Sequence, residues 1–548
     1  MIPFHRLMPL TAAAAVLLAV ATPALAQSGP VVDAPAGAAM GRTEGDVQVF
    51  KGLPYAAPPI GAARWAPPRP APRWSGVKDA NRFGPACFQP RSGPGSIYAD
   101  DPGPMSEDCL SLNIWAPSGA HNLPVLVWIH GGALTAGSSN ESIYDGGKLA
   151  KAGLVVVSIN YRLGVFGYLA HPVLSAESPL GVSGNYGLLD QIEALRWVQR
   201  NIAAFGGDAS NVTVAGQSAG GLSVLYLMAS PPARGLFAKA IAESAYMIST
   251  PELKERRFGQ DSAEASGLAL AAKLHAPNVA ALRAMDPAKL TQGAIAARFA
   301  PFGTIDGQIL PRQLVETFDR GEQARVPVLA GFNSGEISAL RVLAPPIPTL
   351  ASTYEKTIRQ QYGDLADAYL RLYPSANMEA SIQAATRDAL YGWTAERLAR
   401  KQTQWGQPAY LYIFDHAIPA ADEAGLHGFH AAELPYVFGT LSRTPPLWPK
   451  SPPTAAEATL SKAMIGYWSS FARTGAPRAA GEPDWPAFGP AGLFLAFQDT
   501  PRVGADLMPG MYAFNEEVVC RRRASGDQAW YWNVGLYSPP LPPKAAGC

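Results

Sequence analysis

Short, almost wholly apolar runs recur along the chain, separated by segments long enough to form helices. Six runs have this character: residues 125–129, 154–159, 212–215, 240–243, 326–330 and 409–414. Continuous apolar runs of this length are typical of strands buried on both faces, as in a parallel sheet covered by helices. Segments such as residues 188–203 have the length of a helical crossover. The pattern predicts an α/β fold with a mostly parallel central sheet.

Two longer intervals, residues 251–325 and 340–407, are rich in Ala, Leu, Arg and Glu at helical spacing. The sequence has neither an internal repeat nor a low-complexity linker that would separate them from the rest. We therefore interpret them as helical excursions from one catalytic domain that covers residues 27–548. The many prolines that follow Gln27 exclude regular helix and predict edge strands and surface turns there.

The amino terminus has the pattern of an export signal. Arg6 provides a basic start, residues 10–20 are apolar, and Ala24-Leu25-Ala26 supplies the small residues that a signal peptidase accepts. Residues 1–26 are therefore predicted to be a signal peptide. Because no later apolar run reaches the roughly 18 residues of a membrane span, we expect an exported, periplasmic or secreted protein without a stable membrane anchor.

The charge balance excludes some partners. Lys plus Arg number 44 and Asp plus Glu 43, so no basic excess attracts nucleic acid. The only compact basic run, residues 521–523, is interpreted as a solvated loop. The sequence contains no H-E-x-x-H, C-x-x-C or G-x-x-x-x-G-K-[ST] pattern, so neither a metal nor a cofactor is expected.

Candidate chemistry begins at Gly216-Gln217-Ser218-Ala219-Gly220, which matches the G-x-S-x-G nucleophile elbow. A strand-like run precedes it and the apolar helix formers 219–229 follow it. Such a turn forces its central residue into a strained conformation, and flanking glycines let the backbones pass. The pattern predicts a nucleophilic Ser218 and places the amide of Ala219 at a helix N-terminus, where negative charge is favoured.

Three segments carry a family resemblance. FGGDASNVTVAGQSAGG at 205–221 resembles the serine signature of the type-B carboxylesterase and lipase family, EDCLSLNIWAP at 107–117 resembles its second signature, and HAAELPYVFG at 430–439 resembles its histidine segment. The resemblance extends from about residue 41 to 477. It implies an α/β-hydrolase fold with helical insertions near the mouth of the active site.

The general base is sought among the histidines after Ser218, because α/β-hydrolases have the chain order serine, acid, histidine. These are His275, His416, His427 and His430. The resemblance implies His430, which alone has the family spacing. His427, three residues earlier, is the main rival, and His416 is interpreted as structural.

The acid is expected on a loop at the carboxyl end of a strand, where it orients the imidazole. The apolar run 326–330 leads into Gly-Phe-Asn-Ser-Gly-Glu, which resembles the family's G-x-N-x-x-E acid loop and implies Glu336. Asp306 is the rival, although its Asp-Gly context is typical of a turn.

The second part of an oxyanion site is expected at His130-Gly131-Gly132-Ala133, directly after a predicted strand. The family form is often H-G-G-G. The resemblance implies the amides of Gly132, Ala133 and Ala219 as oxyanion donors, since the alanine changes only a side chain. His130 is interpreted as a packing residue.

The four cysteines form two sequence-local pairs, Cys87 with Cys109 and Cys520 with Cys548. Four cysteines allow three connectivities, and export permits disulfides. We favour the local pairing, and the flanks of the first pair resemble the family's first disulfide loop.

The resemblance implies a serine hydrolase that cleaves small to medium carboxylic esters through an acyl-enzyme, without a cofactor. The 87–109 loop contains no tryptophan to face a quaternary ammonium, which disfavours selectivity for cationic esters. Two alternatives remain: a lipase acting on lipid esters, and a non-catalytic binding protein on the same fold.

Overall fold

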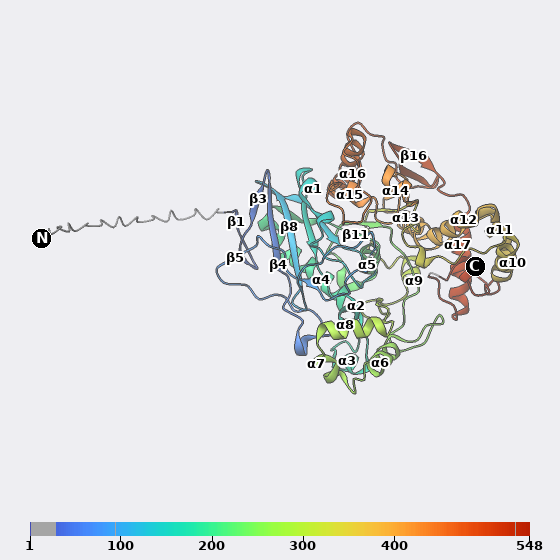
Figure 1. Ribbon diagram of the computed structural model, residues 1–548, viewed down its shortest axis with the longest axis horizontal. Coiled ribbons are helices and arrows are strands. Elements are labelled where there is room, and N and C mark those ends of the chain that lie inside the picture. Colours follow the sequence, from blue (N-terminus) through green and yellow to red (C-terminus); the bar gives the residue numbers. More distant parts are fainter. Residues whose placement is uncertain (2–28, 94, 532) are drawn as a thin grey trace.

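The six apolar runs lie side by side in one large sheet (Figure 1). The computed structural model describes residues 29–93, 95–531 and 533–548 together with Met1, so the rest of the predicted signal peptide lies outside the described residues. Within the described residues, this sheet has eleven strands. Their spatial order is β16 (Pro501–Ala505), β15 (Leu493–Phe497), β14 (Ala409–Phe414), β13 (Val328–Asn333), β12 (Lys239–Glu243), β11 (Gly207–Gln217), β9 (Leu123–Ile129), β10 (Val155–Ile159), β8 (Ser111–Pro117), β4 (Val47–Pro54) and β3 (Arg42–Glu44).

The centre of this sheet is parallel and its edges are antiparallel. Strands β15, β14, β13, β12, β11, β9 and β10 run parallel to their neighbours in this order. Strand β16 pairs antiparallel at one edge, and β8, β4 and β3 do so at the other. The predicted parallel core is confirmed, and the proline-rich amino-terminal region supplies edge strands.

The remaining elements are short strands and the helices. Small sheets contain β1 (Val31–Ala34), β2 (Gly37–Met40) and β5 (Val77–Asp79), and separately β6 (Ala86–Cys87) and β7 (Met105–Ser106). The α-helices are α1 (Gly147–Lys151), α2 (Gly164–Tyr168), α3 (Pro172–Glu177), α4 (Tyr186–Asn201), α5 (Ala219–Ala229), α6 (Ala263–Lys273), α7 (Val279–Ala284), α8 (Pro287–Ala296), α9 (Leu314–Asp319), α10 (Ala351–Tyr362), α11 (Ala366–Leu372), α12 (Met378–Arg387), α13 (Trp393–Gln404), α14 (Pro419–Glu423), α15 (Leu434–Phe438), α16 (Ala455–Thr474) and α17 (Met511–Ser525).

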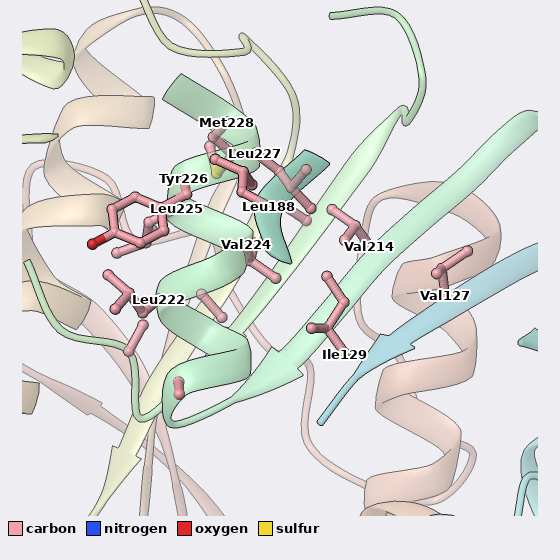
Figure 2. Close-up of a cluster of buried hydrophobic side chains, with 14 of the residues drawn as sticks. Val127, Ile129, Leu188, Val214, Leu222, Val224, Leu225, Tyr226, Leu227 and Met228 are labelled. Carbon is pink, nitrogen blue, oxygen red and sulfur yellow. The ribbon is translucent and has the colours of Figure 1, made fainter. Parts of the chain in front are cut away.

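Helices cover both faces of the sheet, as strand β9 illustrates. Val125, Val127 and Ile129 pack into the core on the side of α4 and α5, whereas Leu126 and Trp128 pack into the core on the side of α16. Figure 2 shows the first of these clusters, with side chains of α5 beside those of β9 and β11. Burying each such side chain contributes about 1.5–3 kcal/mol. Because successive residues alternate between two cores, the strand has to be apolar throughout.

The two intervals of helical spacing extend away from the sheet. The first contains α6, α7 and α8, which share a small apolar core with the region around α2 and α3. The second contains α10, α11 and α12, whose core includes side chains of α17. These groups lie at different ends of the molecule (Figure 1). Helix α13 instead lies against β13 and β14, directly on the sheet.

Both predicted cysteine pairs form disulfides. The Cα atoms of Cys87 and Cys109 are 5.0 Å apart, and those of Cys520 and Cys548 are 5.7 Å apart. Each bond closes a local loop and restricts the unfolded chain. The Cys87–Cys109 bond closes the segment that precedes β8, and the Cys520–Cys548 bond attaches the carboxyl terminus to α17.

The arginine run is not a solvated loop, and that prediction is wrong. Residues 521–523 lie within α17, and the helical twist directs consecutive side chains to different surroundings. Arg521 and Arg522 are buried, at 2% and 1% exposure. Arg521 forms an ion pair with Glu517, one turn earlier in α17, and another with Asp364. The second is a tertiary contact that the local sequence does not reveal.

Candidate active site

Ser218 stands at the junction of β11 and α5 in a strained conformation. Its φ is +58°, a region that residues other than glycine rarely adopt. A Cβ on Gly216 would come within 2.5 Å of the carbonyl carbon of Gly220, and a Cβ on Gly220 would come within 2.1 Å of the Ile129 oxygen. Both glycines are therefore required where strand and helix cross. The backbone of Ser218 is held by a hydrogen bond from its amide to the Glu243 carbonyl, 2.9 Å.

The loop after β9 approaches this turn closely. A Cβ on Gly131 would lie 3.2 Å from the Ser218 Cβ. Gly132 has φ +100°, and Ala133 has φ +55°, an unusual value for an alanine. The amides of Gly132 and Ala133 donate no hydrogen bond within the described residues, and neither does that of Ala219 at the start of α5. Three free N–H groups therefore lie around the elbow, as an oxyanion site requires.

His430 and Glu336 are brought together from distant parts of the chain. The imidazole Nδ1 is hydrogen-bonded to the Glu336 carboxylate, and both side chains are buried. The other Glu336 oxygen accepts a hydrogen bond from the Asn333 amide, 2.9 Å. The Asn333 side chain also donates to the Phe429 carbonyl at 2.7 Å, which fixes the histidine loop against the acid loop.

The opposite edge of the imidazole faces the elbow. His430 Nε2 lies 3.3 Å from the side-chain nitrogen of Gln217, the residue before Ser218. Among the described residues no hydrogen bond joins the Ser218 hydroxyl to His430 in this conformation. A serine hydroxyl rotates about a single bond, and catalytic hydrogen bonds are often long or misaligned until substrate binds.

Two further buried carboxyl groups, Glu433 and Glu243, lie near the acid loop. Glu433 accepts a hydrogen bond from the Asn333 side chain, and burial together with the neighbouring Glu336 raises the pKa of Glu433 to about 7. Glu243 accepts a hydrogen bond from the Trp468 indole at 2.7 Å, and burial raises its pKa well above the ordinary value. The neutral form of both groups is therefore more readily populated than is usual for a carboxyl group, and it is Glu336 that is hydrogen-bonded to the imidazole.

Three neighbours of His430 were not predicted from the sequence. Gln217 lies inside the elbow motif but received no role. The Tyr98 hydroxyl, from the Cys87–Cys109 loop, donates to the His430 carbonyl at 2.8 Å. The ring of Tyr391 lies 5.3 Å from the imidazole and belongs to a π-helical turn, η8 (Asp388–Gly392). Such turns are frequent at functional sites, but no local pattern in the sequence marks either tyrosine.

The rival residues lie in other environments. Asp306 accepts hydrogen bonds from three successive backbone amides, residues 308–310, which is the geometry of a capped turn. His416 bridges Asp499 and Glu457, and His275 is exposed after α6. His130 stacks on Tyr161 with ring centroids 4.6 Å apart, and burial lowers its pKa to about 4, in keeping with a packing role.

His427 is held between two carboxylates rather than near the elbow. Its Nδ1 lies 2.9 Å from Asp422 and its Nε2 lies 3.4 Å from Asp415. The hydrogen bond to Asp415 is the main cause that raises the pKa of His427 to about 9, and the same contact lowers the pKa of Asp415 to about 2. The imidazolium therefore forms an ion pair at neutral pH on the loop that leads to His430.

Replacing this histidine, His427→Gln, is expected to change stability and leave catalysis intact. Because the folded pKa is raised from 6.5 to about 9, the ion pair stabilises fully below pH 6.5, and this contribution is lost as the pH rises through 9. The side chain is 50% exposed, so the effect is below about 1 kcal/mol. Thermal melts of both proteins from pH 6 to 10 would measure it. A pH-independent difference, or loss of turnover, would contradict this assignment.

The family of this chain is established by comparison with known proteins. A sequence model of the carboxylesterase family matches residues 28–514. The chain belongs to the carboxylesterase family. This carboxylesterase is 39% identical over 473 residues to fumonisin B1 esterase of Sphingopyxis macrogoltabida, covering 83% of this chain and 84% of that one. It is 36% identical to para-nitrobenzyl esterase of Bacillus subtilis (strain 168), covering 82% and 91% of the two chains.

Solved structures agree with this assignment. A PNB esterase structure superimposes on the carboxylesterase with a TM-score of 0.77 and 33% identity, covering 88% of this chain and 99% of the other. The protein therefore has the α/β-hydrolase fold and is a carboxylic ester hydrolase. In the part of the chain that the structure describes, no helix is long and apolar enough to cross a membrane. Among the described residues, no three or more His, Cys, Asp or Glu side chains are arranged so that they could hold a metal ion.

Proposed function

We propose that Ser218, His430 and Glu336 form the catalytic triad of this carboxylesterase. The observation that carries the proposal is the position of the His430 imidazole, with Nδ1 on the Glu336 carboxylate and Nε2 towards the elbow that presents Ser218. Ser218 attacks the ester carbonyl while His430 takes its proton. Glu336 holds the imidazole tautomer and stabilises the imidazolium.

The amides of Gly132, Ala133 and Ala219 receive the negative charge that develops on the carbonyl oxygen. They are already oriented by the strained loop and the helix start, so little reorganisation is needed during the reaction. His430 then protonates the leaving alcohol. Water activated by the same imidazole releases the carboxylic acid and restores Ser218. No cofactor takes part in either step.

The protein is further proposed to act after export, as one catalytic domain of residues 27–548 with the helical groups at residues 251–325 and 340–407 as excursions. The two disulfides support an oxidising compartment, periplasmic or extracellular. Residues 1–26 have the pattern of a signal peptide.

A chain-length series of esters tests the function. The mature protein would be assayed on p-nitrophenyl esters from acetate to palmitate and on a para-nitrobenzyl ester, since one relative is a para-nitrobenzyl esterase. We expect turnover with an optimum at short to medium acyl chains, and stoichiometric labelling of Ser218 by a fluorophosphonate. Absence of both turnover and labelling would overturn the proposal in favour of a binding protein.

Lipid esters are a second candidate because of one exposed apolar loop. Between the acid loop and α10, Val342, Ile347 and Leu350 are 88%, 48% and 61% exposed. Exposed apolar side chains that gather in one patch can form a contact surface. Lipase action predicts a jump in rate above the solubility limit of a medium-chain triglyceride. Saturation below that limit would favour soluble esters.

A further inference from the structure

The segment that the disulfide between Cys87 and Cys109 closes contacts the proposed active site at two separate points. One contact is made to the loop that carries His430. The other is made to the main chain directly after the oxyanion loop. In both, a side chain of the segment is hydrogen-bonded to main-chain atoms of the site. The segment therefore links two parts of the site that are far apart in the sequence.

Tyr98 holds the main chain of the general base. Its hydroxyl donates to the His430 carbonyl at 2.8 Å, and its ring lies nearly perpendicular to the imidazole, with centroids 6.5 Å apart. The peptide that contains this carbonyl leads into Ala431, whose φ of +70° is rare for alanine. A hydrogen bond to the peptide that precedes a strained residue opposes relaxation of that strain. Tyr98 thereby keeps the imidazole in the orientation in which Nδ1 is bonded to Glu336.

Gln89 makes the second contact and uses both atoms of its side-chain amide. The amide donates to the Gly137 carbonyl at 2.9 Å and accepts from the Gly137 N–H at 2.8 Å. Gly137 lies against the oxyanion loop, because a Cβ on Gly137 would come within 2.6 Å of the Gly131 oxygen. The Gly132 carbonyl accepts from the amides of residues 135 and 136, both at 2.9 Å. Gln89 therefore holds one end of the turn that presents the oxyanion amides.

The disulfide joins the two contacts by a short path. Gln89 is two residues after Cys87, and its side chain also donates to the Cys87 carbonyl at 3.1 Å. Pairing of β6 with β7 aligns Cys87 with Ser106, close to Cys109. The connection thus runs through residues 87–89, the disulfide and residues 98–109, all of which the structure describes.

We propose that Tyr98 and Gln89 are positioning residues, which make residues 87–109 a clamp between the general base and the oxyanion loop. The proposal rests on the roles proposed above for His430 and for the oxyanion amides. Proton transfer and oxyanion stabilisation have to act on the same tetrahedral intermediate. An error in the distance between them therefore lowers kcat even when the substrate still binds. The clamp keeps that distance fixed.

A double-mutant cycle measured with a short-chain p-nitrophenyl ester tests the clamp. Tyr98→Phe keeps the ring and removes the hydroxyl, and Gln89→Met keeps the side-chain length and removes the amide. Each is expected to lower kcat by about three- to tenfold, the effect of a lost hydrogen bond, with KM nearly unchanged. Because both changes open the same clamp, the double variant should lose no more than the worse single variant.

A matched control removes the same kind of hydrogen bond elsewhere. The Tyr467 hydroxyl donates to the Pro483 carbonyl at 2.6 Å, and Tyr467→Phe should leave kcat unchanged. Losses that multiply in the double variant of Tyr98 and Gln89 would overturn the clamp, because they would show two independent effects. A rise in KM in place of the fall in kcat would overturn it as well.

Opening the disulfide gives a second measurement. A variant with Cys87→Ala and Cys109→Ala should lose kcat as the double variant does, and adding Tyr98→Phe to it should change kcat by less than about twofold. Its control, with Cys520→Ala and Cys548→Ala, should keep kcat. Circular dichroism would identify a variant that fails to fold, and the cycle of side-chain variants, which retains both disulfides, then decides.

The outcomes separate the clamp from the proposed function. Wild-type turnover that neither Tyr98→Phe nor Gln89→Met lowers would overturn the clamp and leave the triad intact. Absence of turnover and of fluorophosphonate labelling in the wild-type protein would overturn the proposed function, and the clamp with it.

Discussion

Ser218→Ala is expected to lower kcat for p-nitrophenyl esters by about 10⁴- to 10⁶-fold, because the acyl-enzyme can no longer form. The residual rate over water would come from the oxyanion amides and substrate binding alone. Ser218 has a strained φ of +58°, and alanine has to adopt the same backbone conformation at this position. Because the backbone strain is the same in both proteins, we expect the variant to fold and the loss of rate to come from the missing nucleophile. Steady-state kinetics with circular dichroism of both proteins would separate chemistry from unfolding.

A matched control lies on the same helix. The Ser223 hydroxyl donates to the Ala219 carbonyl and accepts from Gln191. Ser223→Ala removes a hydroxyl of the same kind, one turn away from the elbow, and should keep turnover within a few-fold. If Ser218→Ala retained a similar rate, the nucleophile assignment would be wrong.

Glu336→Gln is expected to cost roughly 10³- to 10⁴-fold in kcat, since an amide can hold the imidazole in the wrong tautomer and cannot stabilise the imidazolium. Both Glu336 oxygens are engaged, one by His430 and one by the Asn333 amide, so glutamine fits the site while breaking its charge complementarity. The measurement is kcat/KM as a function of pH.

Glu433→Gln distinguishes the acid from its neighbour. Glu433 is equally buried and close to Glu336, but it accepts its hydrogen bond from the Asn333 side chain. Its pKa is raised to about 7, so the neutral form that glutamine imitates is already populated near neutral pH. We expect a loss of at most about tenfold. The opposite ranking of the two variants would make Glu433 the acid. Asp306→Asn should change the rate little, because its carboxylate caps a turn.

The central sheet was predictable because its strands are buried on both faces. Each strand has to be apolar at every position, as Leu126 and Val127 on β9 show by packing into opposite cores. The elbow was predictable for a steric reason, because only glycine fits where Gly216 and Gly220 meet other backbone atoms. Such local constraints restrict the residue types at these positions and can therefore be recognised in the sequence.

Contacts between distant segments do not restrict the local residue types in this way, and so they cannot be recognised in the sequence. Tyr98 contacts His430 from a loop more than three hundred positions away in the sequence. Nothing in its local sequence distinguishes it from other aromatic residues. The arginine run was interpreted wrongly for the same reason, since the carboxylate that pairs with Arg521 is Asp364, on a different helical group. The role proposed for Ser218 rested on the elbow pattern, and those proposed for Glu336 and His430 rested on family spacing. The hydrogen bond between the His430 imidazole and Glu336 now supports the pairing of these two residues.

The order of the strands also determines when this chain becomes able to act. The oxyanion loop follows β9, Ser218 follows β11, Glu336 follows β13 and His430 follows β14, and these strands are near neighbours in the sheet. Contacts of such long sequence separation form late, because the loops that join them must close first. Esterase activity on refolding should therefore return only when the sheet is complete, after most of the helical signal has recovered.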